Sequence, residues 1–347
     1  MLQLLRRHPA RVTDPDQASL FVLPLMPYIS SGAGECMGET HEQRMVRTRS
    51  ALLRSEHFRR NGGHDHLLIT NTFRVKLFGP WFKQLLSNAT VAWFEQPLLA
   101  NGQRRQGTLY RLAFWRCTIV IPYLTNPFCA LQREIDRPPH ASRRAGSVFF
   151  QGSWSAAHNL RRHFKELNQL PSSHVHDVPR WHECQGSNQS KPDCVVARSR
   201  GSRLHTARGM LQHEFCLVPR GDTPTSGRLF VALACRCVPI VISNKFAEHF
   251  PYASRGRYDE WTVNLPEQRF MKAPMQSVEE AIANARPKLS QMREAMESVS
   301  TELLYDAPGS RAADNMLREW SRACAAADNQ RQTRDPTHRQ RRQRQKA

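Results

Sequence analysis

The stretch EFCLVPRGDTPTSGRLFVALACRCVPIVIS, residues 214–243, constrains the fold of this chain more than any other. It begins with a short apolar run that ends at Pro219, and a dense group of turn-forming residues follows. Leucine and phenylalanine then recur at helical spacing, and the β-branched run 238–242 suits a buried strand. The stretch therefore predicts a strand, a tight loop, a helix and a second strand.

The loop in this predicted unit has the chemistry of a phosphate site. Ser226 or Thr225 could cap the helix by accepting a hydrogen bond from its first free N–H groups. Those N–H groups and the positive end of the helix dipole would face one point, which favours an anion such as a diphosphate. Arg228 in the first turn could reach that anion, and Arg220 flanks the loop. A polar turn with surface arginines is the structural alternative, because no established phosphate-loop pattern is present.

The same residues resemble the C-terminal signature of the exostosin family of glycosyltransferases, glycosyltransferase family 47. That signature reads F-C-L-x-P-x-G-D-T-P-[ST]-S-x-R-L-F-D-A and then C-[IV]-P-V-[IV]-[IL]-S. The resemblance is strongest to the plant-type xylosyltransferase- and glucuronosyltransferase-like branch. It implies an α/β fold of the GT-B type, with two Rossmann-like domains facing across a cleft. It also implies an inverting transfer of a sugar from a nucleotide diphosphate sugar, expected to be a UDP-sugar, to a glycan.

The resemblance places the donor site on the signature. The expected donor-binding residues are Arg220, Gly221, Asp222, Thr223, Ser226, Arg228 and, after the second strand, Glu248. Val231 stands where the family usually has an acid, and Arg236 stands near a usually small residue. If the acid held a sugar hydroxyl or Arg228, its loss would weaken donor binding; if it faced solvent, the change would be harmless. A catalytically inactive exostosin-like glycan-binding or partner subunit is therefore the alternative function.

A patchier resemblance extends over roughly residues 12–300. Residues 13–21 resemble the family's T-x-D-P-x-x-A-D-L-F segment, and residues 147–152 its F-F-x-G strand. We place a break at Pro138-Pro139. We therefore expect an N-terminal Rossmann-like domain over residues 1–140 on the acceptor side and a C-terminal one over 141–324 on the donor side. The basic, low-complexity residues 325–347 predict a disordered tail.

Inversion requires a general base, which the sequence does not identify. Asp65 and His66 are the catalytic candidates, because a carboxylate can fix the tautomer of a neighbouring imidazole. A turn that caps a strand end is the structural alternative for this pair. Glu39 is a further candidate base, and with Glu35 and His41 a possible acceptor contact in the loop after the first predicted strand.

The charge balance favours anionic partners. Lys plus Arg is 50 against 30 acidic residues, a formal charge of +20, which suits nucleotides, acidic glycans, nucleic acid or anionic membrane surfaces. A nucleic-acid-binding protein is supported only by this charge, so no specific nucleic-acid partner is expected. The protein could also form a homo- or hetero-oligomer. Nothing resembles a D-x-D metal site, so the expected co-substrate is the nucleotide sugar, with no metal or other cofactor.

Nine cysteines make an odd count, so at least one would be free if disulfides form. Cys184 and Cys194 could pair in an oxidising lumen. A zinc site using His182 or Cys235-x-Cys237 is the rival interpretation. Cys216, Cys235 and Cys237 lie beside apolar runs and are expected to be small core residues.

The expected location comes from the resemblance. No apolar stretch reaches the length of a membrane span, and the first residues lack a signal core. Exostosin-like enzymes usually carry an N-terminal anchor and work in the Golgi lumen. We therefore expect a protein of the Golgi lumen or membrane, and a chain truncated at its N-terminus that begins inside the globular part.

Overall fold

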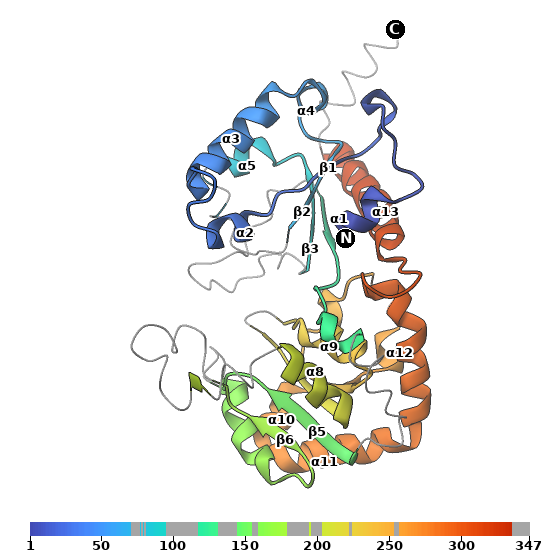
Figure 1. The fold of residues 1–347 in the computed structure, drawn as a ribbon. Coiled ribbons are helices and arrows are strands. Elements are labelled where there is room, and N and C mark those ends of the chain that lie inside the picture. Colours follow the sequence, from blue (N-terminus) through green and yellow to red (C-terminus); the bar gives the residue numbers. More distant parts are fainter. Residues whose placement is uncertain are drawn as a thin grey trace. The chain divides into compact units, whose positions relative to one another are not determined.

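Two compact α/β units make up the structure (Figure 1). A computed structural model describes residues 1–70, 77, 79, 81–94, 117–130, 144–154, 159–178, 194–195, 203–221, 224–252 and 257–334. The first unit comprises Met1–Ile121 and Ala313–Ala347, and the second comprises Pro122–Ala312. Each unit has its own sheet, and every strand pairing is parallel. Two α/β units with parallel sheets agree with the predicted fold class.

The first unit has a four-stranded sheet whose strands lie in chain order. The strands are β1 (Phe21–Leu23), β2 (His66–Ile69), β3 (Thr90–Trp93) and β4 (Cys117–Val120). The helices are α1 (Leu2–Arg6), η1 (Pro15–Gln17), α2 (Pro27–Gly32), α3 (His41–Arg54), α4 (Glu56–Arg60), α5 (Phe82–Leu85) and α13 (Ala312–Arg334). Figure 1 shows α3 and α5 on one side of the sheet and α1 and α13 on the other. The apolar residues of α3 and α4 pack on β2 and β3, which is why this face is covered.

The second unit has a five-stranded sheet in the order β6-β5-β7-β8-β9. The strands are β5 (Arg144–Gln151), β6 (His174–His176), β7 (His213–Pro219), β8 (Val238–Ile242) and β9 (Val263–Leu265). The helices are η4 (Asn159–Gln169), α8 (Arg203–Gln212), α9 (Arg228–Ala234), η7 (Ala247–His249), η8 (Tyr258–Glu260), α10 (Glu267–Lys272), α11 (Pro274–Ala285), η9 (Arg286–Lys288) and α12 (Leu289–Leu303).

The strand order of this sheet reverses between β5 and β7. The chain enters at β5, adds β6 on one side, and then adds β7, β8 and β9 on the other. In an open parallel sheet, ligands bind at the carboxyl ends of the strands where the order reverses. The expected strand–loop–helix–strand unit is confirmed as β7, α9 and β8, and its loop follows β7 at this point.

The unit boundary lies earlier than the break placed at Pro138-Pro139, residues that lie outside the described part of the chain. Residues 122–130 belong to the second unit because they are bonded to it. Tyr305 Oη donates to the carbonyl of Pro122 (2.6 Å), Asn126 Nδ2 donates to the carbonyl of Arg203 (2.6 Å), and Cys129 forms a disulfide with Cys235.

The C-terminal segment differs from the prediction, which placed residues up to 324 in the second domain and a disordered tail over 325–347. α13 returns to the first unit, where Cys324 forms a disulfide with Cys117 of β4. The helix also continues to Arg334, so residues 325–334 are helical where a disordered tail was expected. Alanine-rich residues at the start of that segment favour a helix. The rest of the predicted tail, residues 335–347, lies outside the described residues.

Seven cysteines of the described residues take part in disulfide bonds. Cys216, Cys235 and Cys237 are fully buried, which confirms that they are core residues. In addition, Cys216 pairs with Cys237, and Cys235 pairs with Cys129, which the sequence did not predict. The same bonds rule out zinc binding by Cys235-x-Cys237, because both sulfur atoms are used. Cys194 is also in a disulfide; its expected partner Cys184, like His182, lies outside the described residues.

Cys36 is a free, exposed cysteine, in agreement with the odd cysteine count. Within the described part of the chain, no helix is both long enough and apolar enough to cross a bilayer.

Candidate functional site

The loop after β7 is anchored at both ends. Arg220 N donates to the carbonyl of Ile242 at the end of β8 (3.0 Å), and Gly221 N donates to the carbonyl of Thr225 (2.9 Å). Ser226 Oγ accepts a long hydrogen bond from Arg228 N (3.4 Å). The N-cap residue of α9 is Gly227, without a side-chain capping bond, so the cap expected from Ser226 or Thr225 was wrong. α9 has only seven residues, so its dipole is a weaker source of positive potential than the side chains around the loop.

Arg228 packs against the end of β5. Its guanidinium lies over the ring of Phe150, 4.4 Å from the centroid. A Cβ atom on Gly152 would collide with Nη2 of Arg228, so glycine is what allows this approach. Among the described residues, no carboxylate lies within ion-pair distance of Arg228. Burial and then the charge of Arg161 lower the pKa of Arg228 to about 9, which leaves the guanidinium protonated at neutral pH.

Arg161 of η4 spans the two strands at the reversal of strand order. Its Nη1 donates to the carbonyl of Ser153 after β5 (3.4 Å), and its Nη2 donates to the carbonyl of Arg220 after β7 (3.1 Å). Arg228 Nη2 approaches Gly152, and Arg161 bonds the carbonyl of the next residue, Ser153, so the two guanidinium groups lie near each other at the end of β5. Their mutual repulsion would be relieved by an anion placed between them.

Arg220 lies beside the same strand ends and contacts an acid. Its Nη1 is 3.6 Å from Glu267 Oε2 at the start of α10. Glu267 Oε1 accepts from the backbone N of Asn244, so this acid is fixed to the end of β8. The loop residues Asp222 and Thr223, two of the expected donor contacts, lie outside the described residues.

The structure thus brings together most of the expected donor set. Arg220, Gly221, Ser226 and Arg228 meet at the carboxyl end of β7. Glu248 is exposed in η7 and makes no hydrogen bond or ion pair with the described part of the loop. Arg161 and Gly152 were not among the predicted site residues, because their place at the site depends on β5 and β7 being neighbours.

The two departures from the family signature lie outside this group. Val231 lines a cavity of about 450 Å³ with Leu124, Arg203 and Tyr305 among its neighbours, and Arg228 does not line it. This position fits the interpretation in which loss of the acid does not affect Arg228. Arg236 lies just after the C-cap of α9 in the left-handed conformation (φ 59°), and its side chain pairs with Glu297 of α12.

Asp65 and His66 lie in the first unit, at the amino end of β2. His66 Nδ1 is 2.8 Å from Asp65 Oδ1, and the buried imidazole stacks on Phe21. Burial lowers the pKa of His66, and Asp65 offsets only part of that effect. Burial raises the pKa of Asp65, but hydrogen bonds from Asn61 and His66 outweigh it and leave the pKa below its usual value. Ligands bind parallel sheets at the opposite, carboxyl edge, so this position favours the structural alternative.

The loop candidates Glu39 and His41 also have structural partners. Glu39 Oε2 is 3.0 Å from Arg47 Nη2. The ring nitrogens of His41 contact Ser30 Oγ (3.0 Å) and the carbonyl of Leu77 (2.7 Å). Glu35 is exposed.

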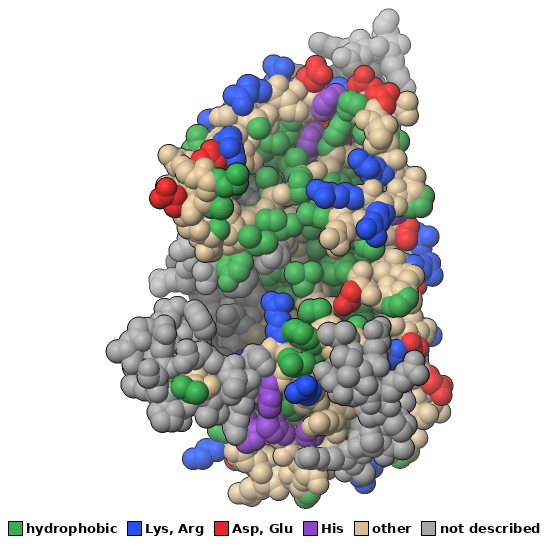
Figure 2. Space-filling view, in the orientation of Figure 1, with side chains coloured by type: hydrophobic (Ala, Val, Ile, Leu, Met, Phe, Trp, Pro, Cys, Tyr) green, Lys and Arg blue, Asp and Glu red, His purple; other side chains and the backbone are tan. Residues whose placement is uncertain are grey.

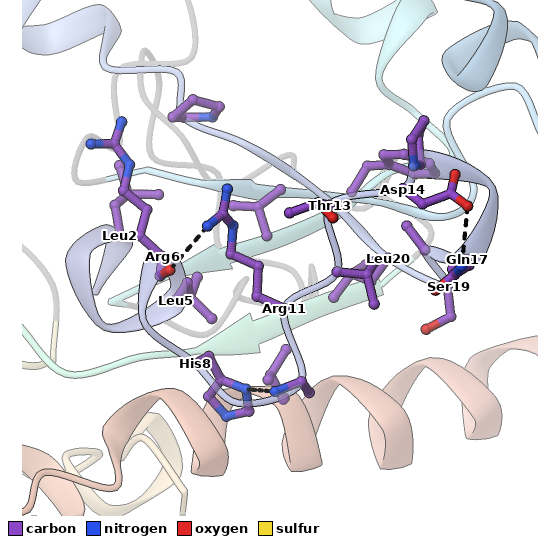
Figure 3. A pocket seen from close by; sticks show the side chains of 18 of the residues that line it. Leu2, Leu5, Arg6, His8, Arg11, Thr13, Asp14, Gln17, Ser19 and Leu20 are labelled. Carbon is purple, nitrogen blue, oxygen red and sulfur yellow. Dashed lines mark hydrogen bonds between the residues drawn. The ribbon is translucent and has the colours of Figure 1, made fainter.

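A second cavity, of about 550 Å³, lies in the first unit between the N-terminal segment and α13 (Figure 3). Arg6, Arg11 and Trp320 line it, and His8 holds the segment to α13 through Asp314 (3.0 Å). None of the predicted site residues lines this cavity. The candidate site is therefore the arginine-rich end of β5 and β7.

Two α/β units with parallel sheets, one of them with two guanidinium groups at a reversal of strand order, define an α/β protein with a candidate anion site. Residues 1–282 match the model of the Exostosin GT47 domain, and the chain belongs to this family. The recognition of the family from the signature stretch is therefore confirmed.

The relatives that match this chain are named as glycosyltransferases. A probable xyloglucan galactosyltransferase of Arabidopsis thaliana is 24% identical over 342 residues, covering 86% of this chain and 68% of the relative. A second probable xyloglucan galactosyltransferase of Arabidopsis thaliana is 33% identical over 101 residues, covering 27% of this chain and 20% of the relative. A xyloglucan-specific galacturonosyltransferase of Arabidopsis thaliana is 23% identical over 269 residues, covering 75% of this chain and 36% of the relative. The chain thus spans between 20% and 68% of these relatives' own lengths.

A solved structure with weaker likeness is the pneumococcal O-GlcNAc transferase GtfA in complex with UDP and GlcNAc. It is 11% identical, covers 82% of this chain and 60% of its own, and superposes with a TM-score of 0.39.

Proposed function

We propose that this chain is a glycosyltransferase that moves a sugar from a UDP-sugar to a glycan acceptor with inversion at the anomeric carbon. Its membership of the exostosin family and the glycosyltransferase names of its relatives support the class of reaction. The observation that carries the proposal is the pair Arg228 and Arg161, two cations that meet at the carboxyl ends of β5 and β7.

This pair suits the leaving group of glycosyl transfer. As the bond between sugar and diphosphate breaks, negative charge builds on the diphosphate oxygens. Guanidinium groups match phosphate oxygens with two parallel donors, and groups fixed before the reaction stabilise the developing charge most effectively. Phe150 and Gly152 hold Arg228, and backbone carbonyls hold Arg161, so both are fixed in advance.

The donor site that we propose consists of Arg161, Arg220, Gly221, Ser226 and Arg228, with Asp222 and Thr223 as expected neighbours from the signature. Glu248 stays a candidate for the donor ribose or sugar. The acceptor side would then lie in the first unit. We assign no general base.

Replacement of Arg228 tests the donor site. Arg228→Ala should abolish measurable UDP binding, while Arg228→Lys should retain part of it because the charge remains. Isothermal titration with UDP provides the measurement, and a thermal melt reports whether each variant is folded. Unchanged UDP affinity in folded Arg228→Ala would refute the assignment.

Hydrolysis and transfer assays with a panel of UDP-sugars test the reaction. We propose that two guanidinium groups stabilise the diphosphate without a divalent metal, so a chelator should leave the activity unchanged. Inactivation by the chelator, with recovery on adding Mn²⁺ or Mg²⁺, would contradict this part of the proposal.

A catalytically inactive glycan-binding or partner subunit is the second candidate. Val231, in place of the acid of the signature, is the observation that favours it. UDP binding without turnover of any UDP-sugar would support this candidate over the enzyme.

We also propose that the protein works in the Golgi lumen. Its disulfides support this location, because disulfides persist in oxidising compartments. The glycan partner would be met there, and we expect no specific nucleic-acid partner. Retention of the full-length protein in a Golgi fraction tests the location.

A further inference from the structure

One arginine of α3 organises the connection that follows β1. Arg44 Nε donates to Ser30 Oγ (2.9 Å), and its Nη2 donates to the carbonyls of Ser30 (2.8 Å) and Gly34 (2.7 Å). Its Nη1 donates to the carbonyls of Cys36 (3.4 Å) and Glu39. Arginine has five N–H donors in a rigid plane, so this side chain can hold α2 and residues 33–39 in one shape.

Arg44 takes no carboxylate partner among the described residues. Its five contacts are four backbone carbonyls and one hydroxyl. Because this half-buried cation donates mainly to backbone carbonyls, its role is to fix the conformation of the backbone around it. The next turn of the chain adds a capping box, in which Thr40 and Gln43 start α3. The connection is therefore a built structure rather than a loose loop.

This connection lies at the carboxyl edge of the first sheet. It follows the carboxyl end of β1, and His41 ties it to the carbonyl of Leu77 (2.7 Å), which follows β2. Carboxyl ends of parallel strands share one edge, and in α/β units that edge binds ligands. The Asp65–His66 pair lies at the other edge.

The fixed connection presents large apolar side chains to solvent. Tyr28 is 52% exposed, Ile29 is 59% exposed and Met37 is 97% exposed. Figure 2 shows hydrophobic side chains at the surface of the first unit where α2 lies. A tyrosine on a rigid support offers an apolar ring face and a hydroxyl, which together match a sugar ring with its C–H face and hydroxyl groups.

We propose that Arg44 is a positioning residue that holds α2 and residues 33–39 as the acceptor platform, and that Tyr28 contacts the acceptor glycan. This inference rests on the glycosyltransferase function proposed above. The platform recognises a neutral oligosaccharide, because its exposed side chains are apolar or uncharged apart from Glu35.

Two matched pairs of variants test the platform. Arg44→Gln removes the guanidinium, and Arg49→Gln removes an exposed arginine of the same helix whose side chain makes no hydrogen bond or ion pair among the described residues. Tyr28→Ala removes the ring, and Tyr28→Phe removes only the hydroxyl. The probes are xyloglucan-derived oligosaccharides, chosen because relatives act on xyloglucan by name, and UDP.

Arg44→Gln and Tyr28→Ala should each weaken oligosaccharide binding by about tenfold, the effect of losing one good aromatic contact. UDP affinity should be unchanged in both, and Arg49→Gln should match the wild type with both probes. Amide hydrogen exchange of residues 28–39 should be faster in Arg44→Gln and unchanged in Tyr28→Ala. This last readout separates the positioning role of Arg44 from the contact made by Tyr28.

Unchanged oligosaccharide affinity in Tyr28→Ala would overturn the inference. Failure of the wild type to bind any of the oligosaccharides would also overturn it. If the wild type did not bind UDP, the proposed function itself would be overturned. The two probes therefore distinguish failure of the acceptor platform from failure of the proposed function.

Discussion

Arg161 and Arg228 meet at one site but come from distant parts of the chain. Arg228 belongs to the signature and could be predicted from it. Arg161 depends on β5 and β7 being neighbours, which no local pattern reports. The burial of Arg228 against Phe150 gives the site a high positive potential, because a buried cation lacks the water that would otherwise solvate it.

Arg161→Gln should weaken UDP binding by roughly ten- to a hundredfold, because it removes one charge-assisted contact to the diphosphate, a loss of about 1.5–3 kcal/mol. Arg162→Gln is the matched control, since Arg162 is the next residue along the chain and is exposed. Titration of both variants with UDP measures the difference. Equal affinities would exclude Arg161 from the donor site.

The Asp65–His66 pair makes stability depend on pH. The folded-state pKa of His66 lies below its usual value of 6.5. As the pH falls, His66 therefore takes up a proton in the unfolded chain at a higher pH than in the folded protein. The contribution of His66 to the free energy of unfolding should therefore be fully present above pH 6.5. Below pH 6.5 it should decline by at most about 1.4 kcal/mol per pH unit. Asp65, whose pKa lies below 3.8, adds a separate loss only in stronger acid.

His66→Gln should flatten the decline between pH 7 and pH 5 in urea unfolding experiments. A smaller slope should persist, because burial also lowers the pKa of His249. An unchanged slope in the variant would contradict the assignment to His66. Loss of transfer activity with unchanged stability would restore the catalytic interpretation of the pair.

At the level of single elements, the strand–loop–helix–strand unit could be predicted because its signals are local. Pro219 ends β7, turn formers fill the loop, and the β-branched run 238–242 makes β8. The cysteine pairing could not be predicted in the same way. The burial of Cys216 and Cys237 follows from their apolar neighbours, but their bond requires β7 and β8 to be adjacent, which is a property of the sheet.

The end of α9 offers a test of backbone strain. Arg236 adopts φ 59° at the end of this helix, a conformation that glycine adopts without cost. Arg236→Gly and Arg236→Ala both lose the contact with Glu297, but only glycine removes the strain. The glycine variant should be more stable than the alanine variant by about 1 kcal/mol in chemical unfolding. Equal stabilities would show that the left-handed backbone carries no cost here.

Across the whole molecule, the second unit is one uninterrupted segment, and the first is made of two. A local proline break placed the boundary near residue 140, whereas the contacts of residues 122–130 place it at residue 121. Sequence patterns describe neighbours along the chain, so they could not show that α13 returns to the first sheet. The Cys117–Cys324 disulfide fixes that return.

Replacing Cys117 and Cys324 by serine should destabilise the first unit by about 2–5 kcal/mol, because the bond closes a loop of 207 residues. Hydrogen exchange should become faster in α13, while UDP binding in the second unit should be unchanged. If the variant lost UDP binding as well as the protection of α13 from hydrogen exchange, the two units would not be independent.

The return of α13 also determines the order of events during synthesis. Most multidomain chains complete their N-terminal domain first, as it leaves the ribosome. Here the first unit lacks its last helix until residues after Ala312 have emerged, and by then the entire second unit is already available to fold. The thiol of Cys117 therefore remains without its native partner throughout the translation of the second unit. Oxidation during biosynthesis must spare that thiol, or exchange it later, for the native pairing to form.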